Sequence, residues 1–167
     1  MKVLGIDPSL TSTGLAIVQD GQVHDLKRVR TKLTGHERIE TILNAVRDAA
    51  AGCDAVGIEG AAMNAKGSSV LQIFGLWGVI THDLWATGRH YYVVTPGGRC
   101  KYATGKGNAD KDHVLAAVIR RYATADVTGN DVADALVIAA MGARMLGEPL
   151  EEALPDTHLK AMDGVQW

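Results

Sequence analysis

The start of the chain alternates apolar runs with turn signals in a way that restricts the fold strongly. Residues 2–7 and 14–19 read as strands, and Asp20-Gly21 is a strong two-residue hairpin signal that leads into a third strand near residues 22–30. Strands joined by so short a turn pair antiparallel. The sequence therefore predicts an antiparallel meander at the N-terminal end of a sheet protein.

Helices and strands alternate through the rest of the chain. Apolar spacing predicts helices from about Thr34 to Gly52, from about Ser69 to Thr87, around Val114–Tyr122 and from about Asp131 to Leu146, with short strands at residues 54–59 and Tyr91–Val94. We expect a glycine- and lysine-rich loop after Pro96. The order β-β-β-α-β-α-β-α-α predicts an α/β domain with a mixed sheet.

The length of the chain sets its domain organisation. With 167 residues, 47% of them hydrophobic, it forms one domain with a substantial core, and two domains of ordinary size would not fit. We expect residues 1–147 to form this domain and residues 148–167 to be a peripheral or partly disordered tail. The start lacks the apolar region of a signal peptide, and Cys53 and Cys100 form no CxxC motif. We therefore expect a cytoplasmic protein that does not enter a membrane.

Basic residues are clustered, although the formal net charge of −2 is unusual for a protein that binds nucleic acid. One cluster comprises Lys27, Arg28, Arg30 and Lys32, and the other comprises Arg99, Lys101, Lys106 and Lys111. The second lies among glycines, where backbone and lysines approach phosphates closely. We expect the second cluster to contact nucleic acid.

Four acidic residues stand where a fold exposes carboxylates. Asp7 and Glu59 each end a predicted strand, and Asp131 and Asp134 open the last predicted helix, one turn apart. Mg²⁺ prefers such oxygen ligands, and it can neutralise a phosphate and activate a water. Taken singly, Asp7 is typical of a turn and Asp131 of a helix N-terminus. Together the four predict a metal-dependent nuclease.

The same motifs resemble a known family in order and spacing. They are Gly5-Ile6-Asp7-Pro8 with Thr13-Gly14, Ile58-Glu59, Ala109-Asp110-Lys111 and Asp131-Val132-Ala133-Asp134-Ala135-Leu136. Over roughly residues 1–146 the chain is similar to the RuvC Holliday junction resolvases. The resemblance implies an RNase H-like fold, with a mixed five-stranded sheet flanked by helices. It also implies a homodimeric Mg²⁺-dependent endonuclease that resolves four-way DNA junctions by paired symmetric nicks in recombination and repair.

The resemblance also implies roles for individual residues. Two Mg²⁺ ions, with Mn²⁺ as a substitute, are expected to be held by Asp7, Glu59, Asp131 and Asp134. Lysines at 101 and 111 are expected near the scissile phosphate, with Lys111 counted among the catalytic residues. Arg99, Lys101, Lys106, Lys111 and Met63 are the expected DNA contacts. The predicted helix that ends near Thr87 is apolar on more than one face, so we expect it to form part of the core and of a dimer interface.

One departure from the family bears on substrate choice. In the well-known bacterial members a phenylalanine follows the glutamate by three positions and wedges into the junction, whereas this chain has Ala62. A small alanine cannot stack on a base. Either Met63 or another residue wedges into the junction in its place, or this protein accepts a broader range of DNA substrates than those members.

Other functions stay open at this point. A fork- or flap-cleaving nuclease or an RNA-processing relative would use the same residues. A sugar-kinase or actin-like ATPase also begins with a glycine-isoleucine-aspartate strand, but such proteins need two related domains around the nucleotide. A non-catalytic nucleic-acid-binding module gains nothing from four acids beside DNA.

Overall fold

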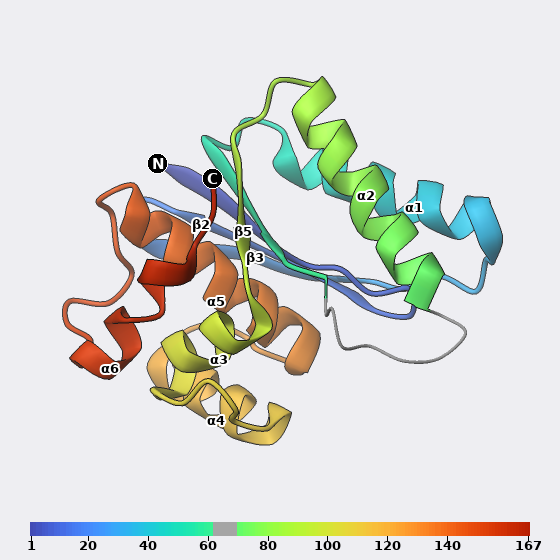
Figure 1. Cartoon of the computed structure of the whole chain (residues 1–167). Helices are drawn as coiled ribbons and strands as arrows, with labels where there is room; N and C mark the ends of the chain where they lie inside the picture. The colour runs from blue at the N-terminus through green and yellow to red at the C-terminus, as the bar shows by residue number, and fades with distance from the viewer. Residues whose placement is uncertain (62–69) are drawn as a thin grey trace.

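A five-stranded mixed sheet forms the centre of the protein (Figure 1), whose computed structural model describes residues 1–61 and 70–167. In spatial order the strands are β3 (Gln22–Val29), β2 (Thr13–Gln19), β1 (Lys2–Asp7), β4 (Ala55–Glu59) and β5 (Tyr91–Val94). The first three along the chain pair antiparallel, whereas β4 runs parallel to β1 and β5 parallel to β4. The predicted meander and the predicted α/β class with a mixed sheet are confirmed.

The turn between β2 and β3 has the backbone that its sequence predicts. Asp20 and Gly21 both have positive φ angles, 51° and 74°. A two-residue turn with two positive φ angles follows the right-handed twist of the strands that it joins. Glycine adopts this conformation freely and aspartate tolerates it better than most residues. The turn brings Gln19 opposite Gln22 and so sets the register of the hairpin.

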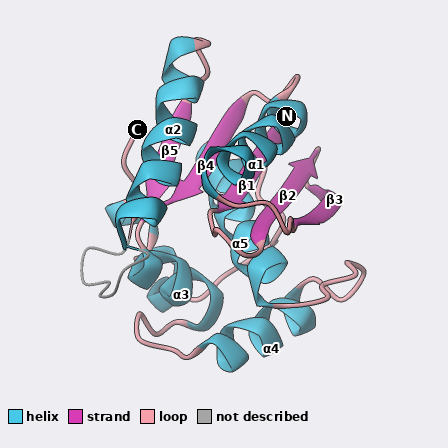
Figure 2. Cartoon of the chain, turned by 90° about the vertical axis from the view of Figure 1, so that its right-hand side faces the viewer, coloured by secondary structure: helices cyan, strands magenta, loops and turns pink. Residues whose placement is uncertain are grey.

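Helices cover both faces of the sheet (Figure 1 and Figure 2). One face carries α1 (Gly35–Ala50) and α2 (Val70–Ala86), and the other carries α3 (Pro96–Thr104), α4 (Lys111–Arg121) and α5 (Asn130–Met145). Successive side chains of β1 point to opposite faces of the sheet. Leu4 and Ile6 pack in the core under α1 and α2, and Val3 packs in the core under α5. Across the described chain, no helix is both long and apolar enough to cross a bilayer.

The most deeply buried helix is α5. Every residue from Val132 to Ala143 is buried. Two glycines of the sheet permit this close packing. A Cβ atom at Gly5 would come within 2.1 Å of the carbonyl oxygen of Ala135, and one at Gly14 within 2.0 Å of that of Asp131. The contact places the start of α5 beside the end of β1.

The segment after Pro96 is a helix, α3, and not the loop that its glycines led us to expect. Thr95 is the N-cap and accepts a hydrogen bond from the backbone N–H of Gly98, and the proline stands in the first turn. Gly105 ends the helix in the left-handed conformation, with φ 79°. Pro96 and Gly105 are therefore the start and stop signals of a short helix and not signals of a loop.

Residues 148–167 pack against the domain. We expected a peripheral or partly disordered tail, whereas the structure shows a short helix α6 (Asp156–Leu159), a 3₁₀ helix η1 (Met162–Gly164) and a β-bridge from Gln166 to Val93. The bridge covers the outer edge of β5, which would otherwise present unpaired backbone groups.

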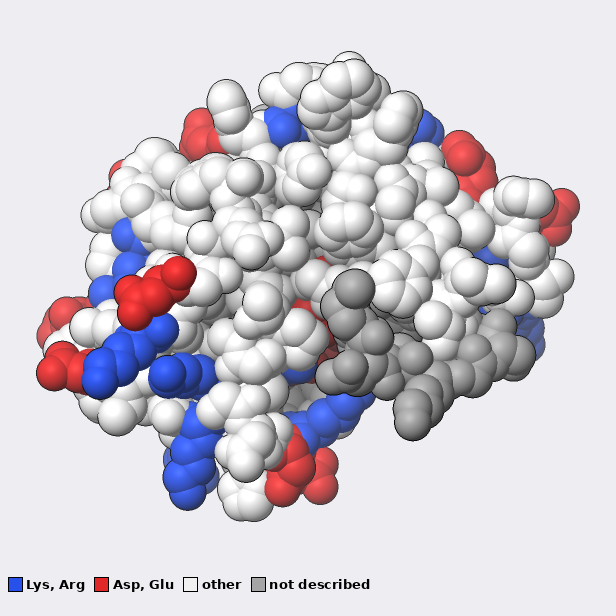
Figure 3. All heavy atoms as spheres, viewed as in Figure 1, with Lys and Arg blue, Asp and Glu red and all other residues white. Residues whose placement is uncertain are grey.

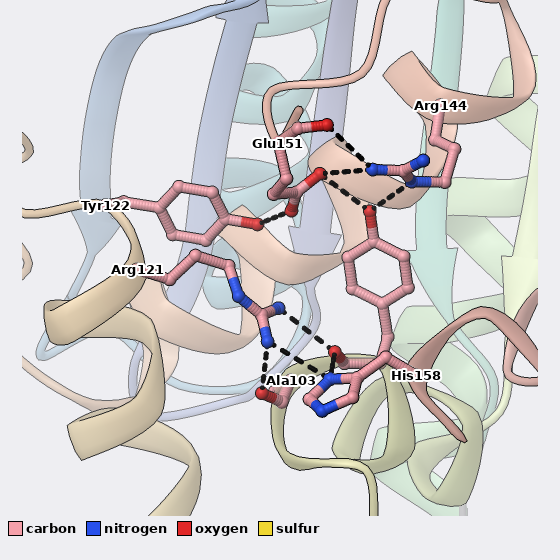
Figure 4. Close-up of polar contacts among 7 residues, drawn as sticks. Ala103, Arg121, Tyr122, Arg144, Glu151 and His158 are labelled. Carbon is pink, nitrogen blue, oxygen red and sulfur yellow. Dashed lines mark hydrogen bonds and ion pairs between the residues drawn. The ribbon is translucent and has the colours of Figure 1, made fainter. Parts of the chain in front are cut away.

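A buried carboxylate fastens this tail (Figure 4). Glu151 accepts hydrogen bonds from the hydroxyl groups of Tyr122 and, at 3.0 Å, Tyr102, and it forms an ion pair of 3.0 Å with Arg144. A buried charge persists only when it is paired and hydrogen-bonded in this way. Glu151 therefore ties together the tail, α3, α5 and the end of α4.

Candidate active site

Two parallel strands deliver the first pair of acidic residues to one edge of the sheet. Asp7 is the last residue of β1 and Glu59 the last residue of β4. Because β1 and β4 are parallel neighbours, their C-terminal ends lie together. The indole N–H of Trp77, in α2, donates a hydrogen bond of 3.1 Å to the backbone carbonyl of Glu59 and holds this strand end.

The second pair comes from α5, whose start is pressed against the sheet. Asp131 lies in the first turn, and Asp134, which is only 4% exposed, lies one turn later. Gly14, which faces Asp7 in the β1–β2 ladder, contacts the backbone of Asp131. In the view of Figure 3, acidic atoms are recessed near the middle of the face, with basic atoms beside them. The four predicted carboxylates therefore gather at one end of the sheet.

The pKa values show how closely these charges interact. Burial raises the pKa of Asp7 well above its ordinary value, and the charges of Glu59, Asp134 and Asp131 raise it further. Burial also raises the pKa of Asp134 to about 6, although the positive charge of Arg99 opposes the rise. Like charges brought together away from water repel one another. The site therefore favours a bound cation.

Arg99 supplies a positive charge inside the site. Its Nε donates to Glu59 Oε1 at 2.5 Å, and its Nη1 donates to Asp134 Oδ1. The side chain is only 8% exposed. Arg99 is one of the expected DNA contacts, and in this structure its guanidinium lies buried between two carboxylates. The orientation of α3 turns Arg99 toward these carboxylates. A contact between Arg99 and DNA stays a prediction.

Ser12 is a site residue that sequence reasoning missed. Its hydroxyl donates to Asp131 Oδ2 at 2.5 Å and accepts a hydrogen bond of 3.1 Å from Nε of Arg30. This chain of contacts holds one oxygen of Asp131 in place and connects it to Arg30, which directly follows β3. The only signal in the sequence was the position of Ser12 beside the Thr13-Gly14 motif.

The predicted basic contacts divide by location. Lys111 is the exposed first residue of α4, and its charge lowers the pKa of Asp134, so it lies within electrostatic reach of the carboxylates. Lys106 is exposed and lines a cavity of about 750 Å³ together with His113 and Arg120. Lys101 is partly buried in α3. Met63, like Ala62, lies outside the described residues.

The donor chemistry of the site fits a hard divalent cation. All four acidic side chains offer oxygen, which Mg²⁺ and Mn²⁺ prefer over nitrogen or sulfur. Burial raises the pKa of Asp7, and the charges of Glu59, Asp134 and Asp131 raise it further although Arg99 lowers it, so a cation in the site would relieve this repulsion. Within residues 1–61 and 70–167, however, no three acidic, histidine or cysteine side chains converge tightly enough to form a ready-made metal site. The residues fit the ion in kind and in charge, and their side chains must adjust to ligate it.

Comparison with known proteins identifies the family. The family model "Crossover junction endodeoxyribonuclease RuvC" matches residues 3–141. The RuvC protein of Mycobacterium ulcerans is 31% identical over 154 residues, covering 83% of this chain and 81% of the relative. That of Mycobacterium avium is 33% identical over 149 residues, covering 83% and 79%. A structure of Thermus thermophilus RuvC in complex with a Holliday junction substrate has a TM-score of 0.72 at 25% identity, covering 87% of this chain and 96% of that chain. The chain belongs to the RuvC family of crossover junction endodeoxyribonucleases.

Proposed function

We propose that this protein is a divalent-metal-dependent endonuclease that resolves four-way DNA junctions by paired symmetric nicks, in DNA recombination and repair. The observation that carries the proposal is the gathering of Asp7, Glu59, Asp131 and Asp134 at one end of the sheet in a chain of the RuvC family. The relatives are crossover junction endodeoxyribonucleases by name, and the Thermus thermophilus structure contains a junction. Both support the choice of substrate.

The acidic residues of the site would bind the divalent ions. A divalent ion, when bound, would neutralise the charge of the DNA phosphate and lower the pKa of the water that attacks this phosphate. Asp7, Glu59, Asp131 and Asp134 would hold the two Mg²⁺ or Mn²⁺ ions that the family resemblance implies. Ser12 fixes the orientation of Asp131 through its hydrogen bond. Such a supporting hydrogen bond keeps a ligand oxygen aimed at the ion.

Lysines near the carboxylates would position the DNA backbone. Lys111 lies close enough to the site to lower the pKa of Asp134, so its ammonium group can pair with the phosphate that is cut. Lys101 and Lys106 lie further along α3 and the turn that follows it. Contacts of this kind fix the register of the DNA but carry no sequence information.

The test of the proposal is cleavage of end-labelled DNA in Mg²⁺. Four-way junction, fork, flap and linear duplex are compared at equal concentration, with EDTA as the metal-free control. We expect opposed nicks in the junction alone and no product in EDTA. Cuts spread over forks and flaps would indicate the broader branched-DNA nuclease instead. Binding without cleavage would contradict the nuclease assignment.

Paired nicks require two active sites, and we propose that α2 joins two copies of the chain. Its outer side carries apolar side chains that are unusually exposed: Leu71 is 84% exposed, Trp85 70% and Val79 38%. Apart from the backbone of its own helix, a Cβ atom at Gly75 or Gly78 would have no neighbour within 4 Å among the described residues, so a second helix can approach both glycines closely. A two-fold axis through such a patch would place the two active sites symmetrically.

Trp85→Glu is expected to convert the dimer to a monomer, because the charge would be buried against an apolar partner. Sedimentation velocity at micromolar concentration measures this change. Far-ultraviolet circular dichroism should be unaltered, since the tryptophan is exposed within one chain. Ile119→Glu is the matched control, because Ile119 is an apolar residue of α4 that is 46% exposed. A dimer that survives Trp85→Glu unchanged would rule out this face of α2.

A further inference from the structure

Arg99 occupies the space between two of the proposed metal ligands. Different nitrogens of its guanidinium contact the two carboxylates: Nε contacts Glu59 and Nη1 contacts Asp134. In the part of the chain that the structure describes, Arg99 is the only basic side chain that forms an ion pair with any of the four acidic residues of the site. It therefore acts as the internal counter-ion of the site.

A fixed helix presents this arginine. Arg99 lies in the first turn of α3, which Thr95 caps. The last turn of the same helix is held by Arg121, which donates to the backbone carbonyls of Tyr102 at 3.0 Å and Ala103 at 2.8 Å (Figure 4). The Tyr102 side chain adds its hydrogen bond to Glu151. Because both ends of α3 are anchored, the guanidinium is directed at the carboxylates by the packing of the fold.

A divalent ion would need the same oxygens. Mg²⁺ binds carboxylate oxygens at about 2.0–2.1 Å, in near-octahedral geometry. The Arg99 guanidinium contacts Glu59 Oε1 and Asp134 Oδ1, and it separates the two carboxylates. The absence of a converged metal site among the described residues agrees with this separation. A second positive charge at the same place would also be repelled by the guanidinium.

We propose that Arg99 and a divalent ion are alternative occupants of the space between Glu59 and Asp134, so that Arg99 weakens binding of this ion in the DNA-free protein. The inference rests on the proposed metal-dependent function. Beyond that function, it assigns Arg99 as a competitor of one divalent ion for the oxygens of Glu59 and Asp134. Without metal, Arg99 then offsets part of the negative charge of Glu59 and Asp134. The metal ion binds in this space only when the two salt bridges of Arg99 break.

The test is Mn²⁺ binding in the absence of DNA, measured by electron paramagnetic resonance of the free ion and by isothermal titration calorimetry. Arg99→Gln removes the charge and keeps a polar side chain. We expect it to bind Mn²⁺ at least about tenfold more tightly than wild type, because a single and a double positive charge about 5 Å apart repel by more than that factor even in water. Its metal-free melting temperature should fall, and the rise on adding Mn²⁺ should be larger than in wild type.

Arg144→Gln is the matched control. Arg144 also pairs with a buried carboxylate, Glu151, but not with any of the four acidic residues of the site. We expect this variant to lose stability and to keep the Mn²⁺ affinity of wild type. Arg99→Lys keeps the positive charge, so its Mn²⁺ affinity should stay within a few-fold of wild type, which provides a second measurement should Arg99→Gln not fold.

The outcomes separate this inference from the proposed function. If wild type binds Mn²⁺ and folded Arg99→Gln binds it equally or more weakly, Arg99 positions the carboxylates and does not compete with the ion. Binding about tenfold tighter in Arg99→Lys would contradict the role of the charge. If neither wild type nor any variant binds Mn²⁺, the metal-dependent function itself fails, and the inference fails with it.

Discussion

Asparagine in place of Asp7 is expected to lower the rate of junction cleavage by at least about 10³-fold while leaving the protein folded and able to bind DNA. The substitution keeps the shape of the side chain and removes one charge. Asp7 ends β1, and the charges of Glu59, Asp134 and Asp131 all act on it, so it lies at the electrostatic centre of the site. Because Asp7 is one of the proposed metal ligands, its loss would weaken binding of any ion that it helps to hold.

Stability should respond in the opposite direction to activity. The pKa of Asp7 is raised because ionising it in the folded protein is unfavourable, so the ionised carboxylate destabilises the metal-free fold at neutral pH. We therefore expect the metal-free melting temperature of Asp7→Asn to equal or exceed that of wild type. Asp25→Asn serves as the control, since Asp25 is an exposed residue of β3. Full cleavage by Asp7→Asn would remove the carboxylate cluster from the mechanism.

Gly14→Ala is expected to reduce the free energy of unfolding by about 3 kcal/mol or more. The new Cβ atom would lie within 2.0 Å of the carbonyl oxygen and 2.5 Å of the carbonyl carbon of Asp131. Both are backbone atoms of α5, which is buried along almost its whole length, so no flexible side chain can move aside. The helix must shift away from β2, and Asp131 moves with it.

Urea denaturation followed by circular dichroism measures this change. Gly164→Ala is the matched control, because Gly164 is the last residue of η1 and a Cβ atom there would meet no described atom within 4 Å outside its own turn. The substitution is at an open surface position, so the control should change the free energy of unfolding by less than about 0.5 kcal/mol. A Gly14→Ala variant that unfolds at the same urea concentration as wild type would show that the contact between β2 and α5 is not tight.

Local patterns in the sequence determined most of the fold. Alternating apolar residues and the Asp20-Gly21 turn predicted the meander, and helical spacing predicted the helices that begin near Gly35, Val70 and Asn130. The same patterns placed Asp7 and Glu59 at the ends of two strands. In the structure these strands are parallel neighbours, so their ends lie at a common edge of the sheet. Such features depend on residues that are close in the chain, where geometry repeats regularly.

Only the tertiary structure determines which side chains contact each other when their residues are distant in the chain. Ser12 meets Asp131, 119 residues later, and Arg99 meets Glu59, 40 residues earlier. The sequence showed Arg99 as one of several basic residues near a predicted loop. Whether such a side chain faces solvent or a buried carboxylate depends on how α3 is rotated and where it is anchored. Its cap at Thr95 and the long-range hydrogen bond from Tyr102 to Glu151 set that rotation, and no local periodicity encodes it.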